Sequence, residues 1–293
     1  MAAAAPEEPH VFPPTFVVSP LGTHTHTLIL LHGRGDSGPS FGSGVYIATP
    51  SSGFTLPSLY PGLKFVFPTT AERYSTTFRK VMNEWFDTVS LSFPEECSHL
   101  QREGLREAVA HINSLIDIEI AAGVPEGNII LGGISQGCAT ALHVLLSRGR
   151  RLGGFVGMSG WMPFASNVRE ICGLTTGAGL RNNAAAAALD THSESESEKE
   201  QEFAAPPMHI DAVMDDDDET LDVLKTPVFL AHGDADETVD YKLGRNMYTT
   251  LKHGLGMDTR WRRYREFGHW YKEPDEIDDI IEFWGEKCGL IPS

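Results

Sequence analysis

The sequence predicts an α/β fold in which a mostly parallel central sheet carries helices on both faces. Apolar segments of strand length alternate along the chain with longer segments whose apolar residues recur at helical spacing. This alternation favours parallel pairing, because a helix can carry the chain back between successive strands. At 293 residues and 41% hydrophobic content the chain can bury a substantial core, and its apolar runs are far shorter than a bilayer requires.

Strands and helices are expected in a regular order. The segments with strand character are 25–31, 63–67, 128–132, 154–158, 227–231 and 259–266. The segments with helical apolar spacing are 100–122, 136–148, 241–253 and 275–288. In an open parallel sheet, ligands bind outside the carboxyl ends of the strands. Residues that directly follow these strands are therefore the first candidates for a functional site.

Most of the net charge of −17 belongs to one segment. Residues 190–222 contain thirteen acidic side chains against the single Lys199. We therefore predict one domain over residues 21–293, preceded by a flexible tail at 1–20 and interrupted by a disordered, low-complexity acidic insertion at 173–222. This charge balance also argues against nucleic acid as a partner, because phosphate binding needs a basic surface.

The termini and cysteines favour a cytoplasmic location. The N-terminus lacks the basic start and apolar core of a secretory signal. The four cysteines are widely spaced and include no CxxC pair, a pattern typical of a reducing compartment.

The stretch IILGGISQGC, which begins at Ile129, places a serine between glycines where a predicted strand meets a predicted helix. A strand that turns sharply into a helix leaves no room for side chains beside the turning residue, and Gly133 and Gly137 would supply the clearance. The pattern is the G-x-S-x-G nucleophile elbow, with Ser135 exposed at the tip of the turn. The N-terminus of the following helix would place backbone N–H groups where negative charge develops during acyl transfer.

A serine nucleophile needs a base and an acid that orients the base, in the chain order Ser, Asp or Glu, His. Among the downstream histidines we favour His269, which begins the loop before the last helix, over His253, which lies within a helical stretch. For the acid we favour Asp236 in the loop after strand 227–231. Asp234 remains the main alternative, and Asp240 is typical of a helix N-cap.

Two backbone N–H groups are candidates for the oxyanion hole. One belongs to Gln136, next to the nucleophile, and the other to Arg34 in the glycine-rich loop HGRGDSG. His32 and His232 both stand at strand ends, and we interpret both as scaffold residues.

The motifs of the chain resemble those of the acyl-protein thioesterase and carboxylesterase family of α/β-hydrolases, also called phospholipase/carboxylesterase. The matching segments are LILLHGRGDSG, KFVFPTT, NEWFD, GVPEGNIILGGISQGCATAL, GFVGMSGWMPF, TPVFLAHGDADETV and FGHW. They occur in family order over nearly all of residues 25–288 except the insertion. The resemblance implies the α/β-hydrolase fold and a metal-free, cofactor-free enzyme that cleaves acyl thioesters or carboxyl esters, including S-palmitoyl groups on cytosolic proteins.

The resemblance also implies a triad of Ser135, Asp236 and His269, with oxyanion donors at Arg34 and Gln136. The chain departs from the family pattern at three places. Arg34 stands where the family has an apolar residue, Cys138 stands where glycine is common, and the acidic insertion replaces a short connection.

Substrate-binding residues are expected in two loops. The candidates for an apolar acyl channel are Tyr74, Phe78, Met82, Trp85, Trp161 and Met162, all of which are equally compatible with a place in the core. We expect the substrate to be an acylated protein, with transient contact at a membrane surface. The alternatives are a general carboxylesterase or lysophospholipase acting on small or lipid esters, and an inactive hydrolase fold that serves as an interaction scaffold.

Overall fold

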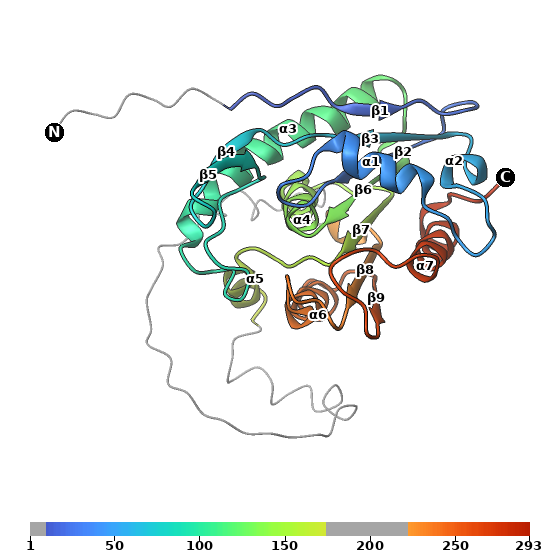
Figure 1. The fold of residues 1–293 in the computed structure, drawn as a ribbon. Coiled ribbons are helices and arrows are strands. Elements are labelled where there is room, and N and C mark those ends of the chain that lie inside the picture. The colour runs from blue at the N-terminus through green and yellow to red at the C-terminus, as the bar shows by residue number, and fades with distance from the viewer. Residues whose placement is uncertain (1–9, 174–221) are drawn as a thin grey trace, which may run out of the picture.

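The computed structural model describes residues 10–173 and 222–293, which form a seven-stranded sheet with helices on both faces (Figure 1). The strand order is β1-β3-β2-β6-β7-β8-β9, and every neighbouring pair is parallel except β1 and β3. The strands are β1 (Phe16–Val18), β2 (His26–Leu31), β3 (Leu63–Phe67), β6 (Ile129–Ile134), β7 (Gly154–Met158), β8 (Val228–Gly233) and β9 (Thr259–Tyr264). The predicted α/β class with a mostly parallel sheet is confirmed.

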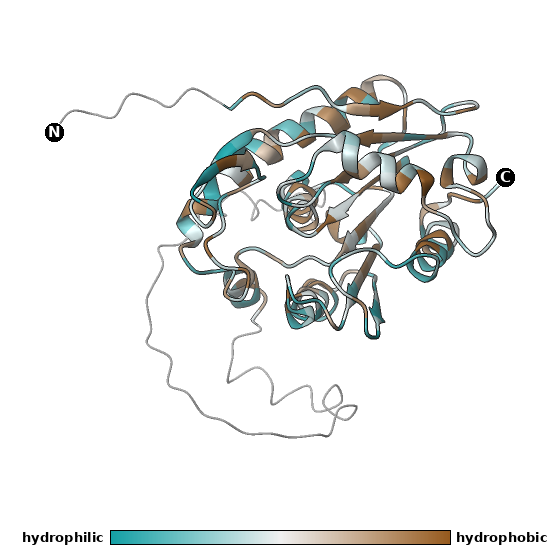
Figure 2. Cartoon of the chain, in the orientation of Figure 1, coloured by the Kyte–Doolittle hydropathy of each residue, from teal (hydrophilic) through white to brown (hydrophobic). Residues whose placement is uncertain are grey.

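The central strands are largely hydrophobic along their length (Figure 2). Nearly all residues of β2 and β6 are buried, whichever face they point to, so helices can cover both faces. In β2, Ile29 and Leu31 join the core under α3, α4 and α6, whereas Leu28 and Leu30 join the core under α1, α2 and α7. The helices are α1 (Gly38–Ile47), α2 (Leu56–Leu59), α3 (Gln101–Ala121), α4 (Gln136–Arg148), α5 (Ala165–Ile171), α6 (Tyr241–Thr249) and α7 (Asp275–Phe283). Helices α6 and α7 each continue into a wider turn, over Thr250–Gly254 and Trp284–Cys288.

Six helices and strands were not expected from the sequence. They are β1, α1, α2, α5 and the separate hairpin of β4 (Glu72–Ser75) and β5 (Lys80–Asn83). The flexible tail predicted over 1–20 is too long, because Phe16 pairs with Phe67 of β3 and adds an edge strand. Residues 1–9 and all of the predicted insertion except Gly173 and Asp222 lie outside the described residues.

Among the described residues, no helix is long and apolar enough to cross a membrane. The longest helix, α3, has 21 residues and is amphipathic: Leu105, Ile112 and Ile116 are buried, while Ile118 is exposed.

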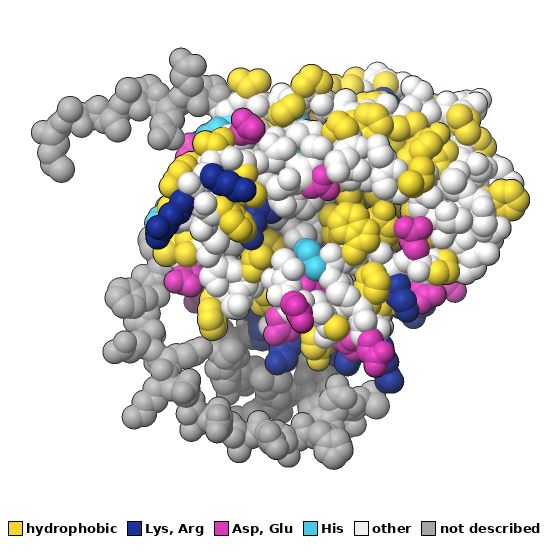
Figure 3. Space-filling view, in the orientation of Figure 1, with side chains coloured by type: hydrophobic (Ala, Val, Ile, Leu, Met, Phe, Trp, Pro, Cys, Tyr) yellow, Lys and Arg dark blue, Asp and Glu magenta, His cyan; other side chains and the backbone are white. Residues whose placement is uncertain are grey.

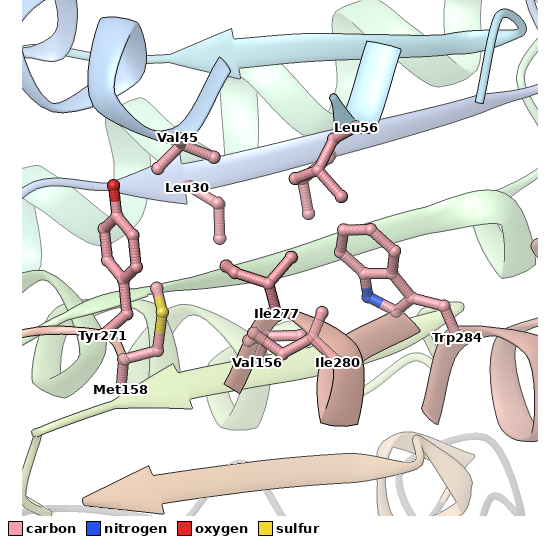
Figure 4. Close-up of a pocket in the computed structure, with 10 residues that line it drawn as sticks. Leu30, Val45, Leu56, Val156, Met158, Tyr271, Ile277, Ile280 and Trp284 are labelled. Carbon is pink, nitrogen blue, oxygen red and sulfur yellow. The ribbon is translucent and has the colours of Figure 1, made fainter. Parts of the chain in front are cut away.

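Packing between α1, α2, α7 and the sheet leaves one small apolar gap of about 20 Å³ (Figure 4). Tyr271, Leu30 and Trp284 are among the side chains around it. A gap of this volume has room for about one water molecule and offers no polar partner to hold one. It is therefore a packing feature and too small for an acyl substrate.

Candidate active site

The residues that follow strands β2, β6, β8 and β9 meet at the carboxyl edge of the sheet. They line a cavity of about 260 Å³ that includes Arg34, Ser135, Gln136, Thr238 and His269. On the face shown in Figure 3, histidine atoms are visible near the centre, a large apolar cluster lies beside them, and basic side chains lie over the β4–β5 hairpin.

Ser135 sits at a strained turn between β6 and α4. Its backbone has φ 55° and ψ −126°, a conformation that non-glycine residues rarely adopt. Hydrogen bonds hold the turn: the Ser135 N–H donates to Met158 O at 2.9 Å, and the Ala139 N–H donates to Ser135 O at 3.1 Å. The strain is thus imposed by surrounding structure, as expected of a nucleophile elbow.

The glycines beside Ser135 are required by the closeness of other backbone atoms. A Cβ atom on Gly133 would lie 2.6 Å from Leu31 O, and one on Gly137 would lie 2.3 Å from the same oxygen. Both distances are shorter than real Cβ contacts allow. The clearance inferred from the sequence is therefore confirmed at both positions.

Asp236 and His269 form a hydrogen-bonded pair, with 2.7 Å between Asp236 Oδ2 and His269 Nδ1. The other carboxylate oxygen accepts the N–H groups of Thr238 and Val239 at 2.8 and 2.9 Å. Burial alone would raise the pKa of Asp236, but hydrogen bonds from His232, His269 and the Val239 N–H outweigh burial and hold that pKa well below its usual range. The carboxylate is therefore ionised at neutral pH and fixes His269 with Nδ1 as the proton donor.

His269 lines the same cavity as Ser135, and its side chain is 21% exposed. These two described residues form no hydrogen bond in this conformation. In enzymes without bound substrate, the hydrogen bond between nucleophile and base is often long or poorly aligned, and it shortens when the substrate binds.

The alternatives for acid and base have other roles. Asp234 accepts hydrogen bonds from Arg263 and from the Glu266 N–H, and Asp240 caps α6 by accepting the Lys242 N–H. His253 lies in the turn after α6, packed edge-on against Tyr248.

His232 is a second histidine on Asp236, a contact that sequence reasoning missed. Its Nε2 lies 3.1 Å from Asp236 Oδ2 and 2.9 Å from Val239 O. Because a carbonyl only accepts, Nε2 must carry the proton and donate to both oxygens. The side chain is fully buried. Its position four residues before the acid, at the end of β8, was the available sequence signal.

The residues of both oxyanion candidates line the cavity of Ser135. Neither the Arg34 nor the Gln136 backbone N–H donates to an acceptor within residues 10–173 and 222–293. The Gln136 side chain is held by accepting the Trp85 N–H and donating to Phe86 O, at 2.9 and 2.7 Å.

The loop that carries Arg34 is fixed on both sides. The Gly35 N–H donates to Asn83 O at 2.7 Å, and Asn83 Nδ2 donates to Asp36 O at 2.9 Å. Within the loop, His32 Nδ1 donates to Gly33 O at 2.7 Å, and His32 Nε2 accepts the Thr70 N–H at 3.1 Å. Burial lowers the pKa of His32, so this histidine is neutral. It has the scaffold role that the sequence indicated.

Of the six predicted substrate-binding residues, three line the cavity of Ser135 and three do not. Phe78, Met82 and Trp161 line the cavity of Ser135. Trp85 is a core residue instead, fully buried, with Nε1 donating to His32 O at 2.8 Å. Tyr74 is 60% exposed on β4 and does not line this cavity.

Met162 lines a neighbouring cavity of about 440 Å³, which shares Trp161 with the first. Sequence reasoning missed Leu91 and Trp270, which also line the cavity of Ser135. Each is an isolated large apolar residue in a loop, a feature that spacing cannot separate from core residues.

Known proteins share both the sequence pattern and the fold. Residues 13–177 match the family model described as Phospholipase/Carboxylesterase. The chain is 27% identical over 266 residues to "Acyl-protein thioesterase 1" of Yarrowia lipolytica, covering 90% of this chain and 92% of that protein. It is 35% identical over 144 residues to a "Probable carboxylesterase" of Oryza sativa subsp. japonica, covering 49% of this chain and 51% of the relative.

The crystal structure of Zea mays acyl-protein thioesterase 2 superposes with a TM-score of 0.63 at 26% identity, covering 94% of this chain and 99% of the maize chain. The likeness confirms the expected α/β-hydrolase fold. The family model spans more than half of the sequence. The chain therefore belongs to the phospholipase/carboxylesterase family of hydrolases.

Proposed function

We propose that this chain is an acyl-protein thioesterase that works through a Ser135, His269, Asp236 triad. The observation that carries the proposal is the shared cavity of a serine on a strained elbow and a histidine paired with a buried carboxylate. A serine hydroxyl is a weak nucleophile at neutral pH, and a neighbouring base of this kind would activate it.

The reaction follows from the roles of these groups. Ser135 Oγ attacks the thioester carbonyl while His269 Nε2 takes the serine proton. Asp236 holds the imidazole by its Nδ1–H and stabilises the imidazolium. The backbone N–H groups of Arg34 and Gln136 and the N-terminus of α4 stabilise the oxyanion. His269 then gives its proton to the departing thiolate. In the second half, His269 takes a proton from a water molecule that attacks the acyl-enzyme carbonyl, and it returns a proton to Ser135 Oγ as the carboxylic acid is released.

Three observations favour a protein thioester as the substrate. Relatives from Yarrowia lipolytica and maize are named acyl-protein thioesterases. Apolar side chains from Phe78, Met82 and Leu91 line the cavity and suit an acyl chain. All four cysteines, Cys97, Cys138, Cys172 and Cys288, are free thiols, which suits the reducing cytoplasm where S-acylated proteins would be met.

A carboxylesterase acting on small or lipid esters is the second candidate. The rice relative is named a probable carboxylesterase, and the same triad chemistry serves oxygen esters. The cavity of about 260 Å³ is small, so the length of the acyl chain is the property that separates the two candidates.

Labelling with a fluorophosphonate probe tests the assignment of the nucleophile. We expect rapid labelling of the wild type and none of Ser135→Ala, with Ser114→Ala on α3 as the matched control that labels normally. Hydrolysis by Ser135→Ala should fall by at least about 10³-fold while its thermal unfolding stays cooperative. Full activity in Ser135→Ala would refute the triad. A steep preference for short p-nitrophenyl esters over a palmitoyl-cysteine peptide would replace the thioesterase with the carboxylesterase.

A further inference from the structure

We propose that the Arg34 side chain makes this cavity selective for substrates that carry a carboxylate near the scissile acyl bond. The inference rests on the proposed hydrolase function and adds a substrate class to it. It concerns the guanidinium of Arg34, whereas the reaction uses only its backbone N–H.

The guanidinium is held at the wall of the reaction cavity. Arg34 lines the cavity together with Ser135, and its Cζ lies 4.7 Å from the centre of the Phe78 ring. Stacking on an aromatic face restrains a guanidinium while leaving its N–H edges available. Phe78 itself stands at the tip of the β4–β5 hairpin, which is anchored to the Arg34 loop through Asn83.

The guanidinium has no ion-pair or hydrogen-bond partner among residues 10–173 and 222–293, although acidic residues lie nearby. Asp87 accepts hydrogen bonds from the Thr76 N–H and hydroxyl. Glu84 is completely buried, and burial raises the pKa of its carboxyl to about 7. Neither acid forms a hydrogen bond or an ion pair with the guanidinium of Arg34, although both are near enough to favour its charged form and raise its pKa against the effect of burial.

Arginines on β9, the edge strand beside β8, show the contrast. Arg262 binds Asp279 at 2.9 Å, and Arg263 binds Asp234 at 2.9 Å. A half-buried guanidinium without such a partner has donors that only water or a ligand can satisfy.

A carboxylate is the ligand that best fits these donors. The planar guanidinium can bind both oxygens of a carboxylate at once, and such charge-assisted pairs gain strength in a partly dehydrated cavity. Asp36 also lines the cavity and would repel a second carboxylate on its own side. We therefore expect a substrate carboxylate at the free edge of the Arg34 guanidinium and away from Asp36.

Two matched pairs of thioesters test the inference by release of free thiol. In the first pair the charge lies on the acyl part: the adipoyl half-thioester of N-acetylcysteamine against the hexanoyl thioester of equal chain length. In the second pair it lies on the leaving group: the hexanoyl thioester of 3-mercaptopropionate against that of 3-mercaptopropionamide. The readout is the ratio of kcat/KM for the charged member to that for the neutral member, which cancels changes in active fraction.

For one of the two pairs, we expect the ratio of charged to neutral kcat/KM to be at least about tenfold higher in the wild type than in Arg34→Leu. This is the effect of one charge-assisted contact. Arg34→Lys should keep a large part of the preference, because the positive charge remains. Lys80→Leu is the matched control: Lys80 Nζ lies 6.0 Å from the same Phe78 ring but does not line the cavity. Its ratios should stay within about twofold of wild type.

Each outcome decides the inference. A change in the first pair places the carboxylate on the acyl chain, and a change in the second places it on the leaving group. Ratios unaltered by Arg34→Leu in both pairs, or reduced equally by Lys80→Leu, would overturn the role of Arg34 while leaving the hydrolase intact. If the wild type released no thiol from the four substrates and also failed to cleave a palmitoyl-cysteine peptide, the proposed thioesterase function would fail, and this inference with it. Cleavage of the peptide alone would overturn the inference and leave the proposed function standing.

Discussion

The elbow at Ser135 and the β4–β5 hairpin both line the cavity and are built in opposite ways. At the elbow, every residue of β6 and all of α4 from Gln136 to Leu142 are buried, and backbone atoms fix the turn. On the β4–β5 hairpin, Tyr74, Phe78 and Val81 are exposed, and the contacts with the cavity come from side chains. Backbone packing thus fixes the position of Ser135, the proposed nucleophile. The side chains of the hairpin, which can be exchanged, form the surface that a substrate would contact.

This difference predicts unequal responses to mutation. The elbow should tolerate almost no change, since its clearances involve carbonyl oxygens that cannot move aside. The hairpin should accept substitutions with changes in selectivity alone.

Gly137→Ala should give the largest effect. The added methyl group would meet Leu31 O at 2.3 Å and His32 O at 2.4 Å, so the elbow must distort or unfold. We expect at least about 3 kcal/mol lower stability, with little soluble protein, as judged by urea unfolding and yield. Gly127→Ala is the control, because a Cβ atom there meets nothing within 4 Å. Native-like stability in Gly137→Ala would break the contrast between the two regions.

Glu276→Gln tests the support of the segment that carries His269. Glu276 is buried in α7 and accepts the Lys272 N–H at 2.9 Å. Burial, reinforced by Asp279, raises the pKa of Glu276 to about 8, despite that hydrogen bond. The folded state therefore holds this proton more tightly than the unfolded state, in which the pKa is about 4.3.

The resulting stability is complete below about pH 4.3 and is lost as pH rises toward about 8. The free energy of unfolding should fall by up to about 1.4 kcal/mol per pH unit in this window because of Glu276. Urea unfolding at several pH values should show a flatter profile for Glu276→Gln. Identical slopes in the two proteins would show that Glu276 is ionised when folded.

His232→Leu tests whether Asp236 needs its second histidine. Removing the Nε2 donor frees the carboxylate to turn away from His269, and we expect kcat to fall about tenfold with KM nearly unchanged. His232→Gln keeps an N–H near the same place and should recover most of that loss. If the Gln variant were as slow as the Leu variant, His232 would be only a packing residue.

Tyr74→Ser should give the smallest effect. Tyr74 is 60% exposed and does not line the cavity, so kcat/KM for thioesters should stay within about twofold of wild type. Phe78→Leu, four residues along the same hairpin, should change acyl-chain preference measurably, because Phe78 lines the cavity. Equal effects of the two substitutions would show that the hairpin acts as a unit and not through individual side chains.

The sequence predicted best those parts that depend on local chemistry. The predicted bounds of β3, α4 and β7 agree with the structure, since each has a continuous apolar pattern and clear end signals. Asp236 could be favoured over Asp240 because Asp240 has a local task as the cap of α6. Asp234 is set apart by distant contacts, since it accepts hydrogen bonds from Arg263 and from the Glu266 N–H.

Prediction failed where contacts between segments far apart in the sequence decide whether a strand forms or whether a side chain is buried. The strand β1 has only three residues and exists because β3 offers it an edge. Trp85 and Phe78 look equivalent in sequence, yet one is buried beneath His32 and the other faces the cavity. Only tertiary contacts distinguish such residues, so the substrate wall could not be derived from spacing.

The two hydrogen bonds that Asn83 makes with the Arg34 loop limit how this enzyme can diverge. A shorter or longer hairpin would shift the peptide of Arg34, whose N–H we propose as an oxyanion donor, so we expect insertions there to lower turnover as well as selectivity. We therefore expect related proteins to change their substrate selectivity by substitutions at positions such as Phe78 and Met82, while the hairpin keeps its length.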